Sequence, residues 1–407
     1  MTFEEKLAQY AELAVRVGVN VQRGQELLIA TTTDTVEFTR LVVAKAYEAG
    51  AKHVHVAFSD PIITRTHYEL APDSAFHEFP DWVVAQRDAV IDKKGAFLWI
   101  DAEDPDLLTG IPAKRLSDAQ KSSGKALERY RQAVGSDKIA WSIVAIPSEK
   151  WAQKVFPDKE DQMAALWQAI FQTVRIGEED AVALWQQHIV KLEQRAALLN
   201  ERRYEKLHYR APGTDLTIGL PKAHIWMSGA SRTPDGVPFI ANMPTEEVYT
   251  VPLKEQVNGV VRNTKPFIYQ GNRIDDFSLR FENGRIVEAQ AAVGQELLDE
   301  LIVADEGAAY LGEVALVPHQ SPISASGILF YNTLFDENAS NHLAIGDSYP
   351  TCLEGGKDLE REQLKDYGLN TSIVHEDFMI GSNSMDIDGI TADGKTEAIF
   401  RSGNWAF

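Results

Sequence analysis

The stretch from Gln25 to Phe58, QELLIATTTDTVEFTRLVVAKAYEAGAKHVHVAF, decides the fold of the first half of the chain. Residues 25–32 form an apolar run that predicts a buried strand, and residues 35–49 repeat apolar side chains with a helical period that ends at Gly50. In residues 53–58 (HVHVAF), β-branched valines alternate with histidines, which predicts a second strand. A strand, a helix and a strand in this order predict a parallel sheet.

The same alternation continues on both sides of this unit. The expected helices are 3–17, 79–93 and 113–134, and the expected strands are 96–101 and 138–146. Helical segments between residues 158 and 204 follow and are expected to bridge the two halves of the chain. We therefore expect an α/β N-terminal domain with a mostly parallel sheet over residues 1–205. No glycine-rich phosphate-binding motif follows a strand, so nucleotide binding is not supported.

From about residue 206 the apolar period changes to two. LHYRAPGTDLTIGL (207–220) holds a Pro-Gly turn between alternating runs, and FSLRFENGRIVEAQA (277–291) holds Asn-Gly, a strong hairpin signal. Helices are expected only near 294–304 and 357–366. The sequence predicts a mainly β (α+β) C-terminal domain over residues 206–407.

The 407 residues include 60 acidic and 40 basic side chains, a formal charge of −20. This charge repels polyanions, so no nucleic-acid partner is expected. No apolar run reaches the roughly 18 residues of a membrane helix, and no membrane association is expected. The single cysteine, Cys352, excludes an intramolecular disulfide, and the charged first residues do not resemble a signal peptide. We therefore expect a cytoplasmic protein.

Candidate metal ligands gather on three segments of the β-rich half: LGEVALV (311–317), NASNHLAIGDSYP (338–350) and TSIVHEDFMIG (371–381). Their histidines and carboxylates are the side chains that bind borderline divalent metals. Glu313 stands in an apolar run, where a buried carboxylate needs a cation or hydrogen-bond donors. A buried pair with an arginine is the alternative for this residue.

The two histidines are His342 and His375. Either one alone is compatible with an ordinary packed or surface histidine. Asp377 strengthens the case for His375, because side chains two residues apart in an extended segment share a face. Glu376 would then face the opposite side, towards solvent. Histidines and carboxylates together form a ligand set suited to two divalent ions.

Two further positions carry chemistry. PTEEVYTVP (244–252) holds Glu246 and Glu247, of which only one would point into a site, and the pattern does not decide which. A solvated surface pair is the alternative. Tyr349 follows a Gly-Asp-Ser turn, where its phenol could donate a hydrogen bond to a developing oxyanion. A tyrosine packed at a loop is an equally good interpretation.

These segments resemble the thermophilic aminopeptidase family, the M29 metallopeptidases. The matching blocks, in the family's order and spacing, are 7–29, 242–252, 311–317, 338–350 and 374–382. The resemblance implies a C-terminal catalytic domain, a homodimer and two divalent metal ions per chain, zinc or cobalt, with manganese or magnesium as alternatives. By position it implies the metal ligands Glu247, Glu313, His342, His375 and Asp377, with Tyr349 as the catalytic tyrosine. Asp386 or Asp388, after the last ligand, would assist from outside the ligand set.

The implied activity is removal of the N-terminal residue from short peptides with a free N-terminus, by a water that two metals activate. A carboxylate near that water would carry its proton to the leaving amine, and Glu313 is a candidate. One alternative is another dinuclear hydrolase, an amidohydrolase or a phosphoesterase. A second is a protein in which the metals only hold the fold.

Overall fold

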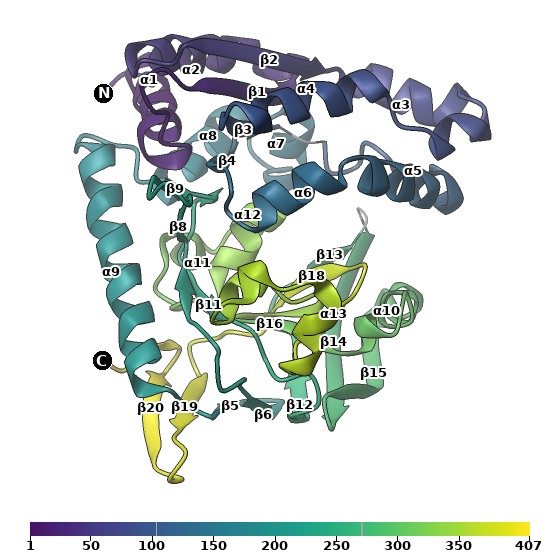
Figure 1. The fold of residues 1–407 in the computed structure, drawn as a ribbon, viewed down its shortest axis with the longest axis vertical. Coiled ribbons are helices and arrows are strands. Elements are labelled where there is room, and N and C mark those ends of the chain that lie inside the picture. Colours follow the sequence, from purple (N-terminus) through teal and green to yellow (C-terminus); the bar gives the residue numbers. More distant parts are fainter. Residues whose placement is uncertain (103, 270–271) are drawn as a thin grey trace. The chain divides into compact units, whose positions relative to one another are not determined.

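The computed structural model describes residues 1–102, 104–269 and 272–407, and it divides into two compact units (Figure 1). Unit 1 consists of residues 1–188 and 230–244, and unit 2 of residues 189–229 and 245–407. Among the helices in the described ranges, none has the length and apolar character needed to cross a membrane.

Unit 1 contains a five-stranded sheet in the order β10-β4-β3-β1-β2. Its strands are β1 (Glu26–Thr32), β2 (His53–Ser59), β3 (Ala96–Asp101), β4 (Trp141–Ala145) and β10 (Asn242–Met243). Every neighbouring pair runs parallel, which confirms the predicted parallel sheet. Leu27, Leu28 and Ile29 are all buried, so both faces of β1 are covered, as is usual in parallel sheets.

The helices of unit 1 begin before β1 and continue after β1, β2, β3 and β4 along the chain. They are α1 (Phe3–Leu13), α2 (Val36–Glu48), α3 (Pro61–Leu70), α4 (Asp81–Asp92), α5 (Ala113–Ala126), α6 (Glu128–Gly135), α7 (Glu149–Val155) and α8 (Gln162–Thr173). Helix α3 was not predicted, and none of its residues is buried, since its apolar Ile62, Ile63 and Leu70 are exposed. Its start is nonetheless encoded: the Asp60 side chain accepts a hydrogen bond from Ile63 N, and Pro61 is the first helical residue.

The segment 230–244 returns to unit 1. It forms the hairpin of β8 (Ala230–Arg232) and β9 (Pro238–Ile240), and then β10 pairs in parallel with β4. Helix α9 (Ala181–Arg202) contributes residues to each unit. The division therefore differs from a single boundary at 205–206, since pairing between β4 and β10 joins segments far apart in sequence.

Unit 2 contains a nine-stranded antiparallel sheet in the order β13-β14-β12-β6-β5-β19-β20-β21, with β15 paired to β14. Its strands are β5 (Lys206–Ala211), β6 (Thr214–Gly219), β12 (Val257–Arg262), β13 (Phe267–Tyr269), β14 (Asn272–Glu282), β15 (Arg285–Val293), β19 (Asp386–Ile390), β20 (Thr396–Arg401) and β21 (Asn404–Trp405). Both predicted hairpins are present, β5–β6 and β14–β15. Asn283 and Gly284 have φ of 49° and 82°, as a tight hairpin turn requires.

A second, five-stranded sheet of unit 2 has the order β18-β17-β16-β11-β7. Its strands are β7 (Met227–Ser228), β11 (Val248–Thr250), β16 (Leu311–Leu316), β17 (His342–Gly346) and β18 (His375–Met379), and all neighbours are antiparallel. Val314, Leu343 and Phe378 from this sheet lie in one apolar core with residues of the nine-stranded sheet. The opposite face is thus free to carry polar side chains. Short helices complete the unit: α10 (Gln295–Ile302), α11 (Pro322–Ser326), α12 (Thr333–Asp336) and α13 (Arg361–Asp366).

Candidate metal centre

The strand register places the candidate ligands on the face of the five-stranded sheet that points away from the core. Glu313 on β16 lies opposite Ala344 on β17, and Ala344 lies opposite Asp377 on β18. His342 and His375 are each two residues from a member of this row, so they project to the same side. Ala344 carries only a methyl group, which leaves space between the two carboxylates.

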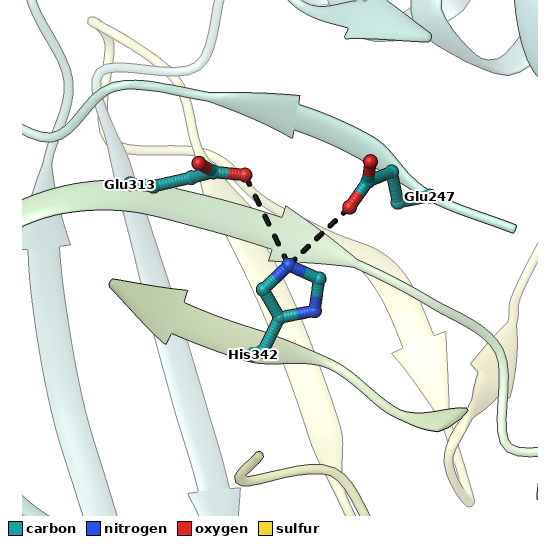
Figure 2. Close-up of side chains that lie close together, drawn as sticks. All are labelled: Glu247, Glu313 and His342. Carbon is teal, nitrogen blue, oxygen red and sulfur yellow. Dashed lines mark ion pairs between the residues drawn. The ribbon is translucent and has the colours of Figure 1, made fainter. Parts of the chain in front are cut away.

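One group of ligands surrounds His342. Its Nε2 atom lies 3.3 Å from Oε2 of Glu247 and 3.9 Å from Oε1 of Glu313. Figure 2 shows both carboxylates turned towards this imidazole. The three residues are buried, and one ligand atom from each lies within 4.8 Å of the others. Oδ1 of Asp377 lies 4.0 Å from the same nitrogen.

A second group surrounds His375. Its Nε2 atom lies 3.2 Å from Oε2 of Glu313 and 3.8 Å from Oδ2 of Asp377. These three residues also offer ligand atoms within 4.8 Å of one another. Glu313 belongs to both groups and turns one oxygen towards each histidine. A carboxylate in this position is suited to bridge two cations.

Backbone carbonyls orient both histidines. Nδ1 of His342 lies 3.2 Å from Ser340 O, and Nδ1 of His375 lies 2.8 Å from Asp347 O. A carbonyl oxygen only accepts hydrogen bonds, so each Nδ1 must carry the hydrogen. When the rings are neutral, each Nε2 therefore presents its lone pair to the carboxylates, which is the arrangement of a metal ligand.

The electrostatics of the cluster fit a cation. Burial raises the pKa of the Glu313 carboxyl, and the Asp377 charge adds to this. Burial lowers the pKa of His342, but the hydrogen bond to Glu247 and the charge of Asp377 outweigh burial and raise this pKa to about 10. Burial also lowers the pKa of His375. The charge of Asp377 and the hydrogen bond to Glu313 outweigh burial and raise this pKa to about 10. Oδ1 of Asp377 is buried and accepts no hydrogen bond from the described residues. The raised pKa values of both histidines show that the carboxylates favour positive charge beside them, and a metal ion supplies such charge.

Glu337 is a further carboxylate of the cluster that the sequence analysis missed. It lies in the 3₁₀ turn Glu337–Ala339 and is buried. Burial and then the charges of Asp377 and Glu247 raise the pKa of its carboxyl well above the usual value. An acidic residue in an irregular segment is usually solvated, so only its position shortly before His342 could have indicated a role. Including Glu337, the carboxylates carry a formal charge that two divalent ions would balance.

Tyr349 lies beside the second group. The centroids of the Tyr349 and His375 rings are 4.6 Å apart, and Tyr249 contacts Tyr349 edge-on at 6.2 Å. The residue is 40% exposed overall. Burial of its phenol and the charge of Glu313 nevertheless raise its pKa well above 10, so the hydroxyl stays protonated at neutral pH and can donate a hydrogen bond.

The structure distinguishes the paired glutamates. Glu247 faces His342. The charge of Glu246 instead acts on Arg195: burial lowers the pKa of Arg195, and the Glu246 charge partly opposes this. Glu376, expected in solvent, is partly buried on the edge strand β18. Burial and then the charge of Asp377 raise the pKa of Glu376 to about 7, so the expectation of a solvated carboxylate was wrong.

Asp386 and Asp388 have other partners. Both lie on β19 of the nine-stranded sheet, where Asp388 contacts Arg210 and Arg401 at 2.5 Å each. Asp386 accepts a hydrogen bond from Ser402 N at 2.9 Å. These contacts give them a structural role instead of one beside the ligands. Two open depressions of the described surface also lie on this sheet and contain none of the five predicted ligands.

Comparisons with known proteins identify the family of this chain. The family model described as Thermophilic metalloprotease (M29) matches residues 3–405. Aminopeptidase AmpS of Bacillus subtilis (strain 168) is 53% identical over 408 residues, covering 100% of this chain and of that protein. Aminopeptidase T of Thermus aquaticus is 41% identical, covering 99% of each. The structure of wild-type AmpT from Thermus thermophilus matches with a TM-score of 0.94 at 39% identity, covering 100% of both chains. The chain therefore belongs to the M29 family of thermophilic metalloproteases.

Proposed function

We propose that this protein is a metal-dependent aminopeptidase that hydrolyses the N-terminal residue from short peptides with a free N-terminus. The observation that carries the proposal is the pair of ligand groups that share Glu313 on one sheet face. The relatives that match this chain over nearly their full length are named aminopeptidases, which supports the same reaction.

In this proposal Glu247, Glu313 and His342 hold one divalent ion, and Glu313, His375 and Asp377 hold the other. Divalent ions held by these residues would supply Lewis-acid chemistry, which polarises a carbonyl and lowers the pKa of a water towards neutrality. Imidazole mixed with carboxylate suits zinc or cobalt, and manganese or magnesium would favour the carboxylates.

Two side chains of the protein would act on the reacting atoms. The protonated Tyr349 donates a hydrogen bond to the peptide carbonyl oxygen as negative charge builds on it, and loss of one such donor costs roughly 10²–10³ in rate. Glu337 takes the proton of the attacking water and passes it to the leaving amine, because its buried carboxyl, whose pKa is raised, holds a proton more readily than an exposed glutamate does. Glu313 was the earlier candidate for this transfer, but both of its oxygens face histidines.

We further propose that the protein is a homodimer that acts in the cytoplasm. The resemblance to the M29 family supports the dimer, and a chain with the single cysteine Cys352 suits a reducing compartment. The formal charge of −20 supports the expectation that nucleic acid is not a partner.

Release of the N-terminal residue from a panel of short peptides and aminoacyl-anilides tests the proposal. The protein is assayed as purified, after chelation, and after addition of zinc, cobalt, manganese or magnesium. We expect activity that chelation abolishes and metal restores, and that His375→Ala lacks. N-acetylated peptides of the same sequence serve as the control and should not be cleaved.

Two results would replace the proposal. Cleavage of phosphate esters or cyclic amides, with no cleavage of peptides, would assign the centre to another dinuclear hydrolase. Two bound ions whose removal lowers stability, without turnover of any substrate class, would indicate metals that only hold the fold.

A further inference from the structure

The segment that leads into β18 is held by a ring of hydrogen bonds. The Asp347 carboxylate accepts from Ser372 N at 2.8 Å and from Arg361 Nη2 at 2.7 Å. Arg361 also donates to Ser372 O, and Asp347 N donates to Val374 O at 2.8 Å. Asp347 thus binds the residues immediately before His375 through both its side chain and its main chain.

The main-chain carbonyl of Asp347 also orients the imidazole of His375. It accepts the hydrogen bond from Nδ1 at 2.8 Å, while Nε2 faces Glu313 at 3.2 Å. The carbonyl that sets the direction of Nε2 therefore belongs to the residue whose carboxylate Arg361 holds. A shift of residue 347 would turn the imidazole.

The backbone around this ring is closely packed. Gly346 has φ of 108°, and a Cβ atom there would lie 2.1 Å from Val374 O. A Cβ atom on Gly312 would lie 2.1 Å from Asp347 O. Both glycines are needed so that three chain segments can approach each other, which leaves the Asp347 carbonyl little freedom. Tyr349 follows two residues later and is positioned by the same segment.

The two histidines differ in how much support they need. His342 is on the inner strand β17, with 2% of its side chain exposed. His375 begins the edge strand β18, with 20% of its side chain exposed, and an irregular segment precedes it. The guanidinium of Arg361 lies outside this segment, with 55% of its side chain exposed.

We propose that Arg361 and Asp347 are positioning residues that hold His375, and with it the second cation, in place. The inference rests on the proposed function in taking His375 as a metal ligand. Residues that orient a metal-binding histidine commonly change metal affinity or activity by about 10–100-fold when altered. Arg361 would act in this way from the surface, without touching metal or substrate.

The test measures metal binding alone. Zinc, and cobalt in a separate titration, are added to the wild type and to Arg361→Gln in competition with a chromophoric chelator. The titration gives the affinity of each of the two metal sites without substrate. We expect one site to bind the metal about 10–100-fold more weakly and the affinity of the other site to be unchanged. Arg361→Lys, which keeps the charge, should recover part of the affinity. In peptide assays, kcat should fall while KM changes little.

The matched control is Arg203→Gln. Arg203 pairs with Glu354 at 2.5 Å on the same unit, and 52% of its side chain is exposed, close to the value for Arg361. This variant should bind both ions as the wild type does. Asp347→Asn is the second variant, since it keeps an acceptor for Ser372 N but loses the ion pair with Arg361.

Each other outcome overturns the inference. Unchanged affinity for both ions in Arg361→Gln and Asp347→Asn would exclude a positioning role. Equal weakening of both ions would indicate general loosening of the sheet. A wild type that binds no metal would remove the ligand role of His375, and the inference with it. A selective loss of one ion in a protein that cleaves no peptide would retain the inference and reject the proposed activity.

Discussion

Glu313 and His375 face each other across a strand that separates them, with Oε2 of Glu313 3.2 Å from Nε2 of His375. Strand β17 lies between their strands, and the residue opposite Glu313 on β17 is Ala344. The contact exists because the side chain at 344 is small. The space above Ala344 is thus part of the site.

Ala344→Val should weaken metal binding while the protein remains folded. The two added methyl groups project from the ligand face, and overpacking of this kind costs about 1–3 kcal/mol. If that cost applies mainly when metal is bound, affinity falls roughly 5- to 150-fold. Chelator competition measures the affinity. Ile345→Val, on the opposite face in the apolar core, is the control and should bind metal normally. Unchanged affinity in Ala344→Val would contradict the assigned face.

Removal of metal should destabilise the protein, because the carboxylates of the buried Glu247, Glu313 and Glu337 and the half-buried Asp377 would repel one another without it. An ion present at a hundred times its Kd stabilises the folded state by about 2.7 kcal/mol. Thermal denaturation with chelator should therefore show a lower midpoint than with zinc. The weaker-binding Ala344→Val should show a smaller difference at the same free zinc. Equal midpoints with and without metal in the wild type would argue against ions at this cluster.

The shared face of His375 and Asp377 could be predicted from the sequence because it depends only on strand periodicity. His375 and Asp377 share a face in any regular strand, and the register then adds Glu313 and His342. Glu337 could not be predicted in the same way, since a 3₁₀ turn has no such alternation and its burial depends on the surrounding fold.

Other features depended on contacts between distant segments. The return of residues 230–244 to unit 1 is fixed by pairing of β10 with β4, which no local pattern indicates. Asp388 illustrates the same limit: its place after the last ligand suggested a role beside the site, but the antiparallel pairing of β19 brings it to Arg210 and Arg401.

Asp388→Asn should lower stability without changing metal content or kcat. Burial raises the pKa of Asp388, but hydrogen bonds from Arg401 and Arg210 lower it more, so the pKa in the folded protein is below the usual value. The ion pairs therefore stabilise the fold above about pH 4, and this contribution disappears as pH falls through the lowered pKa. Loss of a buried hydrogen-bonded charge costs about 1–3 kcal/mol.

Denaturant unfolding at neutral pH measures this loss of stability. The difference in stability between the wild type and Asp388→Asn should become smaller in acid. The control is Asp276→Asn, because Asp276 forms an exposed pair with Arg262 that is worth at most about 1 kcal/mol. A large fall in kcat of Asp388→Asn at full metal content would instead return Asp388 to the catalytic site.

His224 should make the protein less stable in mild acid. The residue is 3% exposed, Nδ1 donates to Pro221 O at 2.6 Å, and Nε2 has no partner among the described residues. Burial lowers the pKa of His224 despite the Pro221 carbonyl, so the folded state favours the neutral ring. The unfolded chain takes up a proton near pH 6.5, and stability is therefore highest above this value and is lost as pH falls below it.

His224→Asn removes this titration and can keep a donor near the position of Nδ1. At pH 8 the variant should be slightly less stable than the wild type, because a buried ring is replaced by a smaller side chain. Between pH 8 and pH 5 its denaturation midpoint should fall less than that of the wild type, both measured with chelator so that metal release does not contribute. His53→Asn, at an exposed position on β2, should fall as the wild type does. A wild-type pH dependence retained in full by His224→Asn would place the acid-sensitive group elsewhere.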